Sequence, residues 1–453
     1  MEVDDRLEGI RTPRQMLRFA LPTIVVMVCI SSYSIVDGGL VSNMIGTDAL
    51  AGLNIIVPIL GLVNAFGFMF ATGGSAYIAK RLGEGDIEDA RRTFSGITVI
   101  ALVAALVLTT VTLMFSSDLV GLLGADERLH DYAETYLRTI IVFGPIIILQ
   151  YLVTQFLITA GRPDISLMGS IANGLANIVL DILFMGPLGM GIEGAAIASG
   201  IGSTITLTVG LVYFTRTKDC PLRYTRPSLS ARMLGKVCSN GASEMVTELA
   251  GSVTTVLFNL TMMAYLGPDG VSSLTMMIYI QFLATAVVIG YSMGVAPIMS
   301  YNYGAGRRDL MGILLRTSVR LVALVSIVIF LTVELFGWVI VGLFAGGSET
   351  VEEIAIHGSA IFGFSFLFMG MNIYVSSLFT SLSNGILSAT VSFLRGLCLQ
   401  VLMILLLPLV FGTDGIWLAV PVTEMVTIVI SMALVHRMAP RYGYLDRVER
   451  VRA

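Results

Sequence analysis

The chain has 453 residues, of which 55% are hydrophobic and only 13% are charged, and its mean hydropathy is +0.86. A soluble domain carries roughly 25% charged residues, so this composition excludes a soluble globular protein and indicates a polytopic membrane protein. The charged N-terminal segment lacks a short apolar core followed by a small-residue cleavage site. We therefore expect the first hydrophobic segment to stay in the protein.

Twelve apolar stretches are long enough to cross about 30 Å of hydrocarbon, which takes roughly 20 helical residues each. They run from about 16 to 45, 50 to 80, 92 to 116, 130 to 159, 164 to 188, 192 to 215, 235 to 266, 271 to 301, 312 to 344, 352 to 381, 386 to 411 and 415 to 437. The predicted fold is thus all-α, with twelve transmembrane helices.

The second half of the chain repeats the first. The second predicted helix contains Gly73 and ends in a loop that begins at Gly83, and 221 residues later the same pattern recurs as Gly294 and Gly304. Two homologous six-helix lobes are expected, related by an axis along the membrane normal, with a substrate cavity between them. The predicted units are an N-terminal segment 1–15, an N-lobe 16–216, a linker 217–231, a C-lobe 232–438 and a C-terminal tail 439–453.

Basic residues gather on one side of the predicted helices. With the N-terminus inside, all Lys and Arg residues except Arg128, Arg138 and Arg395 fall in cytoplasmic segments or at their edges. The positive-inside rule then places both termini in the cytoplasm. We expect a multi-pass protein of the plasma membrane, in contact with membrane lipids.

Two acids lie inside apolar stretches of the N-lobe. Asp37 is in the first predicted helix and Asp181 in the fifth, and Asn173, Asn177 and Asp181 share one helix face at i, i+4 and i+8. An ionisable group at membrane depth is costly, so a functional role is the default hypothesis. The carboxylates can hold a proton, or Na⁺ among carboxylate and amide oxygens. Interhelical hydrogen bonding by the asparagines is the alternative.

The C-lobe carries a second charged set. Glu244 and Glu248 lie one turn apart in the seventh predicted helix, and like charges at this spacing disfavour simultaneous ionisation. Arg395 and Glu424 lie in later helices and could form an ion pair. A structural ion pair and a role in ion coupling both remain open for this set.

Other chemistry is not indicated. The four cysteines have no paired spacing, and the three histidines fall near helix ends. No phosphate-binding Gly-Lys-Ser/Thr loop and no recognisable catalytic set is found, so neither ATP nor enzymatic activity is expected. We expect no cofactor and no nucleic-acid partner, and an ion gradient is left as the energy source.

Short motifs follow one another along the predicted helices: Phe19-Ala-Leu-Pro22, Ile35-Val-Asp37, Ile45-Gly46, Gly73-Gly-Ser-Ala-Tyr-Ile-Ala, Ala160-Gly161-Arg162-Pro163, Asn177-Ile-Val-Leu-Asp181, Gly194-Ala-Ala-Ile-Ala-Ser199, Gly294-Val-Ala-Pro297 and Asn302-Tyr-Gly304. In the order and spacing of these motifs the chain resembles the multidrug and toxic compound extrusion (MATE) family. The resemblance implies a V-shaped pair of six-helix lobes and cation-coupled efflux of organic, often cationic and amphipathic, compounds.

Carried over by motif, the cation site of DinF-like members implies Asp37, Asn177, Asp181 and Ser199, where Ser199 replaces a more usual threonine. NorM-like members keep acidic coupling residues in the C-lobe, and the pattern of Glu248, Arg395 and Glu424 resembles MepA-like members. Ser243 stands where a proline is often found in the family, which puts the bend of the seventh helix in question.

The sequence therefore predicts a monomeric secondary antiporter that exchanges small organic compounds for H⁺ or Na⁺. A lipid or lipid-linked oligosaccharide flippase of the same superfamily is the alternative, although Arg395 is the only arginine at membrane depth. A channel or an intramembrane enzyme is less favoured, because a two-lobe repeat suits alternating access better than a fixed pore.

Overall fold

The computed structural model describes residues 7, 12–217, 220–344 and 348–444, and in these residues the chain is helical with no strands. The first half forms α2 (Pro13–Met44), α3 (Thr47–Gly83), α4 (Ile87–Met114), α5 (Ser116–Leu122), α6 (Glu127–Val142), α7 (Gly144–Thr159), α8 (Pro163–Met185) and α9 (Gly191–Arg216). The second half forms α10 (Ala231–Gly304), α11 (Arg308–Phe344), α12 (Glu349–Phe362), α13 (Phe366–Ser381), α14 (Gly385–Phe393), α15 (Leu399–Phe411) and α16 (Thr413–Tyr442).

Among the described residues, ten helices are long and apolar enough to cross a membrane, or eleven spans when the bent pair α6 and α7 counts as one. The 74-residue helix α10 is far too long for one crossing and contains a single non-helical residue, Gly267, with φ 66° and ψ −157°. Its arms 231–266 and 268–304 therefore supply two spans. The all-α architecture with twelve spans that the sequence predicts is confirmed.

Glycines at matching repeat positions make the tight turn between the first two helices of each lobe. Gly46, between α2 and α3, has φ 132° and ψ 170°, and Gly267, 221 residues later, has a positive φ as well. Residues with a Cβ are essentially excluded from these regions of φ/ψ space. The turn between the first two helices of each lobe thus depends on the same missing side chain.

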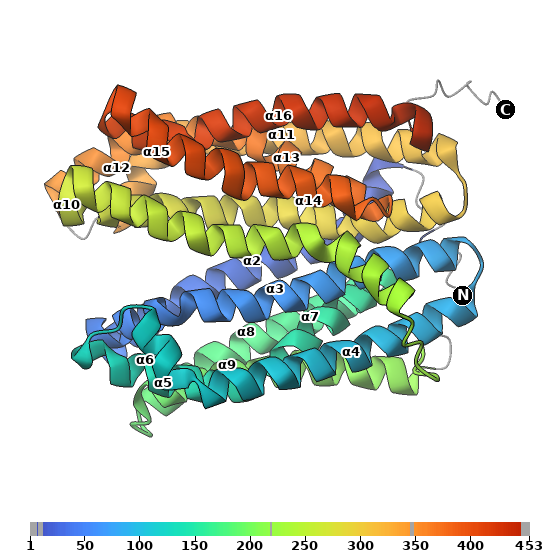
Figure 1. Ribbon diagram of the computed structural model, residues 1–453, viewed down its shortest axis with the longest axis horizontal. Helices are drawn as coiled ribbons and strands as arrows, with labels where there is room; N and C mark the ends of the chain where they lie inside the picture. Colours follow the sequence, from blue (N-terminus) through green and yellow to red (C-terminus); the bar gives the residue numbers. More distant parts are fainter. Residues whose placement is uncertain (1–6, 8–11, 218–219, 345–347, 445–453) are drawn as a thin grey trace.

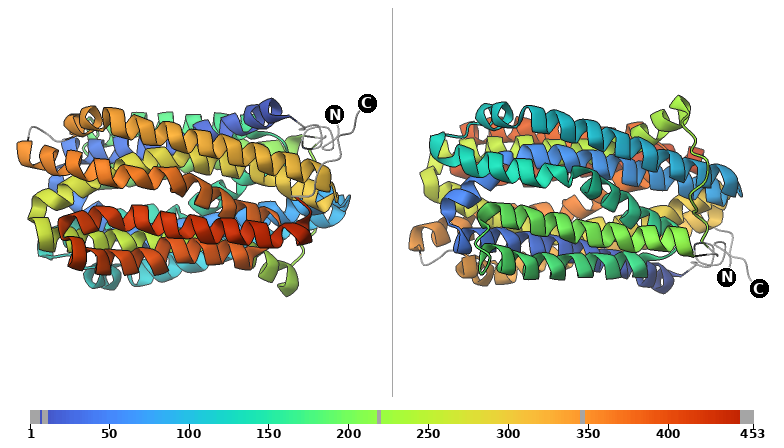
Figure 2. Two further views of the ribbon diagram at one scale, coloured as in Figure 1. Left: turned by 90° about the horizontal axis from the view of Figure 1, so that it is seen from above. Right: turned by 90° about the horizontal axis from the view of Figure 1, so that it is seen from below.

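The helices form two bundles that lie side by side along the long axis of the molecule (Figure 1). The N-lobe holds α2 to α9 and the C-lobe holds α10 to α16, and the views from above and below show the helices of each lobe running along the same axis (Figure 2). Three buried apolar clusters explain the shape. One joins both lobes, through residues such as Met69 and Phe70 with Val295 and Ile298. The other two lie separately in the C-lobe and in the N-lobe.

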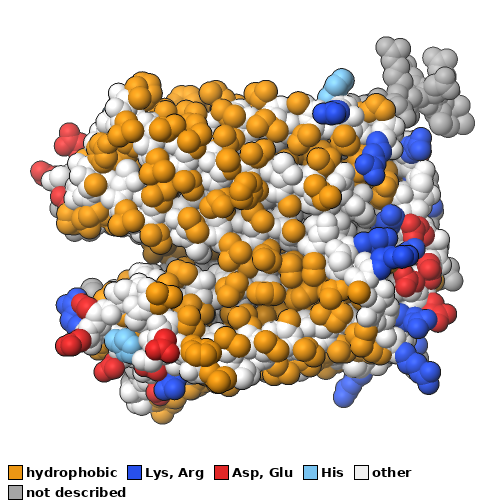
Figure 3. Space-filling view, in the orientation of Figure 1, with side chains coloured by type: hydrophobic (Ala, Val, Ile, Leu, Met, Phe, Trp, Pro, Cys, Tyr) orange, Lys and Arg blue, Asp and Glu red, His pale blue; other side chains and the backbone are white. Residues whose placement is uncertain are grey.

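Charged side chains gather at the two ends of the molecule, and the flank between them is apolar (Figure 3). We call the end at which α2 begins and α16 ends the basic end, because most Lys and Arg side chains in this view lie there. The opposite end, which carries α5, α6 and α12, is called the acidic end. A hollow between the lobes opens at the acidic end (Figure 3).

Two spans are less regular than the sequence predicts. The stretch predicted as one helix over 130–159 is α6 and α7, bent by 54° where Gly144 and Pro145 follow Phe143. The span from α14 to α15 contains a π-helical turn, Leu394–Cys398, which includes Arg395. π-Helical turns are rare and occur often at functional sites.

Candidate functional site

The carboxyl groups of Asp37 and Asp181 meet inside the N-lobe, where α2 packs against α8. Asp181 has no exposed surface and Asp37 is partly buried. The two side chains are within hydrogen-bonding reach of each other. As ionised carboxylates neither can donate, so this contact is stable only with a proton or another cation between them.

Asn177 and Ser199 complete the predicted set. The Nδ2 atom of Asn177 donates to Oγ of Ser199 over 3.1 Å and so ties α8 to α9. Asn177 is one helical turn before Asp181, which places its side chain on the same buried face of α8. The four residues that the family motifs indicate therefore come from three helices and lie together.

Tyr136 of α6 belongs to the same cluster and is not indicated by the sequence analysis. Its side chain is buried, and its hydroxyl lies near Ser199, Asp37 and Asp181. A buried Tyr normally finds a partner for its hydroxyl. The sequence offers only a weak signal for it, because a Tyr in an amphipathic helix is usually a packing residue.

Four buried oxygens of this cluster have no hydrogen-bond donor: Oδ1 of Asp37, Oδ1 of Asn177, and both carboxylate oxygens of Asp181. Leaving one such atom unsatisfied costs about 1–3 kcal/mol, and more when it is charged. Hard cations such as Na⁺ prefer carboxylate and amide oxygens, and a proton would remove the negative charge of one acid. These four oxygens can therefore bind either ion. The described residues contain no group of three or more His, Cys, Asp or Glu side chains that could hold a metal ion.

Asn173, the first member of the predicted polar stripe, has a different environment. It is buried two turns before Asp181, and a Cβ on Gly202 of α9 would overlap its Oδ1 atom. The absence of a side chain at Gly202 lets Asn173 fit between α8 and α9. Its contacts are those of a residue that packs two helices closely.

The charged residues of the C-lobe fall into two groups. Nη1 of Arg395 lies 3.6 Å from Oε1 of Glu424, which is an ion pair but too long for a hydrogen bond. The other carboxylate oxygen of Glu424 accepts from Nδ2 of Asn372 over 2.7 Å, and Asn372 in turn accepts from Ser431 over 2.9 Å. This network links the π-helical turn to α13 and α16.

Glu244 and Glu248 form the second group and make no ion pair among the described residues. Glu244 is within electrostatic range of Arg395, and Glu248 is within range of Glu244 and of Tyr151 in the N-lobe. Tyr151 donates to Asn64 of α3 over 3.2 Å. Glu248 therefore lies at the junction between the lobes.

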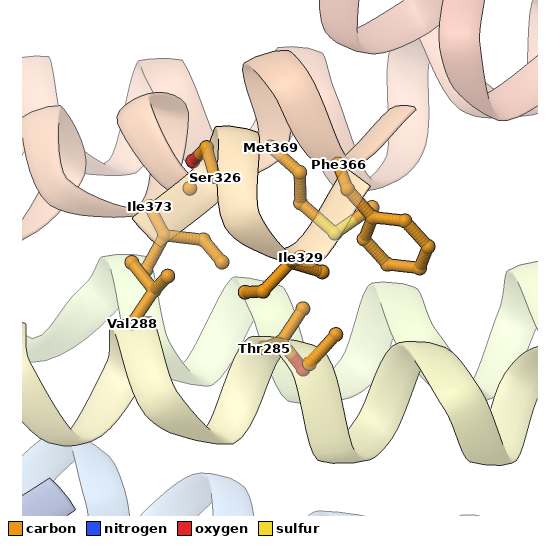
Figure 4. Close-up of a pocket in the computed structure, with 9 residues that line it drawn as sticks. Thr285, Val288, Ser326, Ile329, Phe366, Met369 and Ile373 are labelled. Atoms are coloured by element: carbon orange, nitrogen blue, oxygen red, sulfur yellow. The ribbon is translucent and has the colours of Figure 1, made fainter. Parts of the chain in front are cut away.

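A cavity inside the C-lobe is too small for an organic substrate. It lies between the second arm of α10, α11 and α13, and its lining includes Thr285, Ser326 and Met369 (Figure 4). Its volume is about 10 Å³, room for about one water molecule. The Oγ atom of Ser326 has no hydrogen-bond partner in the protein, and a water in this cavity would supply one. The hollow between the lobes is the candidate path for a larger compound (Figure 3).

Close backbone contacts seal the lobes toward the basic end. A Cβ on Gly73 of α3 would overlap the carbonyl oxygen of Val237, and one on Gly241 of α10 would overlap that of Met69. In addition, the ammonium group of Lys80 lies 5.1 Å from the ring centre of Tyr303 in the other lobe. The lobes are thus in contact at the basic end and apart at the acidic end.

Comparisons with known proteins agree with this architecture. The MatE family model matches residues 22–183 and 245–406, once in each lobe. The multidrug export protein MepA of Staphylococcus saprophyticus is 22% identical over 96% of this chain and 95% of its own length, and MepA of Staphylococcus aureus strain MSSA476 is 21% identical over 94% of both chains.

Two solved structures show the same fold. One is an outward-facing conformation of a multidrug resistance MATE family transporter of the MOP superfamily, with a TM-score of 0.91 at 20% identity over 97% of this chain and 98% of that one. The other is a MOP superfamily transporter from Pyrococcus furiosus, with a TM-score of 0.90 at 20% identity over 98% and 99%.

Proposed function

The chain belongs to the MatE family, and we propose on that basis that it exports organic, often cationic, compounds across the plasma membrane in exchange for H⁺ or Na⁺. The names of its relatives, multidrug export proteins, support this substrate class. The observation that carries the ion-coupling part is the set of four buried oxygens without donors at Asp37, Asn177 and Asp181. Because this is a family of transporters, we propose no catalytic role for the chain.

The chemistry of the N-lobe cluster suggests how an ion would drive transport. With the site empty, two acids face each other and repel, and the negative field favours any cation that reaches the lobe. A bound proton or Na⁺ cancels one of the two negative charges, gives free oxygens of the site a partner and lets α2 and α8 pack closely. The ion and a cationic compound then compete through one conformational equilibrium, which is the requirement for exchange.

Alternating access requires that the lobes also close at the acidic end and separate at the basic end. The concentration of Lys and Arg at the basic end supports a cytoplasmic position for it, with both termini inside. The hollow at the acidic end would then face outward, and the similarity to an outward-facing transporter supports this assignment. Release of the exported compound would take place from this state. We propose that the chain performs this cycle as a monomer.

Efflux from proteoliposomes tests the proposal. A fluorescent organic cation is loaded, and its release is followed under an imposed pH gradient and, separately, under an imposed Na⁺ gradient. Asp37→Asn and Asp181→Asn are expected to lower gradient-driven release at least tenfold, because Asn keeps the shape but loses the charge. Asp118→Asn, at an exposed position of the same lobe, is the matched control. If both site variants release the compound as fast as the unmodified protein does, the assignment of the ion site to the N-lobe is wrong.

A further inference from the structure

A cleft of about 730 Å³ at the basic end lies outside the proposed transport path. It is formed by the first turns of α4 and the linker between the lobes, and its lining is Ile87, Glu88, Arg91, Arg92, Thr225 and Arg226. We propose that this cleft binds the phosphate-bearing headgroup of an anionic phospholipid. The proposal is independent of the transported compound and of the coupling ion.

The walls of the cleft are held in place by hydrogen bonds between the linker and α4. The Nε atom of Arg91 donates to the carbonyl oxygen of Pro221 over 2.8 Å. The backbone N–H of Ser228 donates to the carbonyl oxygen of Arg92 over 3.0 Å, and that of Thr225 donates to Oγ of Ser95 over 2.9 Å. A site with fixed walls pays little ordering entropy when it binds a ligand.

The cleft has an excess of positive charge that the protein does not neutralise. In the part of the chain that the structure describes, Arg91, Arg92 and Arg226 each lack a carboxylate within ion-pair distance. Glu88 is the one acid on the wall. Guanidinium groups bind phosphate through paired hydrogen bonds, and each basic residue near an anionic membrane surface adds attraction.

An apolar stripe on α4 distinguishes a lipid from a soluble phosphate. Val99, Val103 and Leu106 are each at least 41% exposed, and they follow Arg92 at near-integral numbers of helical turns. Val99 is seven residues, or about 10 Å, farther along the helix than Arg92. A phospholipid whose phosphate binds the arginines can therefore lay an acyl chain along this stripe.

The two arginines of α4 are not repeated in the C-lobe. At the 221-residue offset, Arg91 and Arg92 correspond to Gly312 and Ile313. The positive cluster is thus a feature of the junction between the N-lobe and the linker, and is not imposed by the repeat. A lipid bound there contacts both α4 and Arg226 of the linker, and would stabilise the attachment of the linker to the N-lobe.

Native mass spectrometry of the full chain tests the proposal, with phosphatidylglycerol and phosphatidylcholine added to the detergent-solubilised protein. The variant R92Q/R226Q leaves the Arg91 contact with the linker intact. The control R437Q/R441Q removes the same charge from exposed arginines at the end of α16. We expect the first variant to bind phosphatidylglycerol at least tenfold more weakly and the control to change less than twofold. Equal weakening in both, or equal binding of phosphatidylcholine by the unmodified protein, would overturn the proposal.

A second measurement separates a lipid from a soluble anion and does not depend on the arginine variants. Val99→Ser with Val103→Ser makes the stripe polar at exposed positions, so the fold is expected to be kept. This change should weaken phosphatidylglycerol several-fold and leave competition by inorganic phosphate unaltered. If millimolar inorganic phosphate displaces the lipid completely and the serine variant binds it as the unmodified protein does, the cleft is a site for soluble anions and the lipid assignment is wrong.

Discussion

Gly83 and Gly304 occupy matching positions in the two repeats, and each lies against the backbone of the opposite lobe. A Cβ on Gly83 would overlap the carbonyl oxygen of Tyr301, and a Cβ on Gly304 would overlap that of Lys80. Tyr301 itself matches Lys80 at the 221-residue offset, so the two contacts are related by the pseudo-twofold axis of the molecule. The closed end is therefore symmetric, whereas the proposed ion site is confined to one lobe.

This symmetric contact predicts that Gly83→Ala or Gly304→Ala will open the basic end. The new methyl group meets a backbone carbonyl, which cannot move aside as a flexible side chain can. A shift of about 1.4 kcal/mol in the equilibrium between the two states corresponds to a tenfold change in population. The alkylation rate of partly buried Cys238 by a membrane-impermeant maleimide, with the other cysteines replaced, is expected to rise about tenfold.

Gly235→Ala is the control for this experiment, because it lies in the arm of α10 that carries Cys238 and a Cβ there meets no atom within 4 Å. Its effect on the rate should be small. Equal alkylation rates in the Gly83, Gly304 and Gly235 variants would show that these backbone contacts do not hold the lobes together.

A second prediction concerns Tyr136, whose hydroxyl is close to Ser199 and to both acids. Tyr136→Phe removes one oxygen and leaves the ring, so the buried packing of α6 is kept. The loss of this polar contact with the site, worth about 1 kcal/mol, should reduce ion-driven efflux roughly fivefold without loss of folded protein. Tyr132→Phe, one turn earlier on the same helix, is the control. An unchanged efflux rate in the Tyr136 variant would remove this hydroxyl from the site.

A third prediction concerns the ion pair between Arg395 and Glu424, which are 17% and 4% exposed in their side chains. Replacing either one by Gln leaves a buried charge without its partner, and we expect the free energy of unfolding to fall by about 3 kcal/mol. The double variant should lose less than the sum of the two, because no lone charge remains. Denaturant titration in detergent, followed by the fluorescence of buried Trp417, measures all three.

The pair formed by Arg138 and Glu134 is the control for this double-mutant cycle, that is, for the two single variants and the double variant. It has a similar distance of 3.4 Å, but the Arg138 side chain is 60% exposed. Exposed pairs on one helix contribute only a few tenths of a kcal/mol, roughly, so the same Gln substitutions there should be nearly neutral. If the Gln substitutions at Arg395 and Glu424 change the free energy of unfolding as little as those at Arg138 and Glu134, the Arg395–Glu424 pair does not stabilise the fold.

The sequence alone predicts the twelve spans and the two lobes, because long apolar stretches and a repeat are visible without tertiary information. It also singles out Asp37 and Asp181, since a charge in an apolar stretch is conspicuous. It does not indicate Tyr136, because only packing distinguishes a Tyr beside two acids from a Tyr in a core. The glycine pattern repeats visibly, but the contact of Gly83 with Tyr301 depends on how the lobes meet. The bend after Val142 coincides with Gly144 and Pro145, and a proline within a helical pattern is a local signal for such a break.

A last prediction follows from the turn at Gly267, the only interruption of α10 in the residues described. Its φ of 66° and ψ of −157° lie in a region that only glycine enters freely, so Gly267→Ala should lower the free energy of unfolding by about 1–3 kcal/mol. Gly251→Ala, within an arm of the same helix, meets no atom within 4 Å and should be neutral or slightly stabilising. Gly46→Ala should match the Gly267 variant, because Gly46 makes the equivalent turn in the N-lobe with φ 132°. Thermal unfolding of the three purified variants distinguishes these cases. If all three unfold at the same temperature, the paired turns tolerate a side chain, and the two arms of α10 are oriented by their contacts with the rest of the C-lobe and not by the glycine.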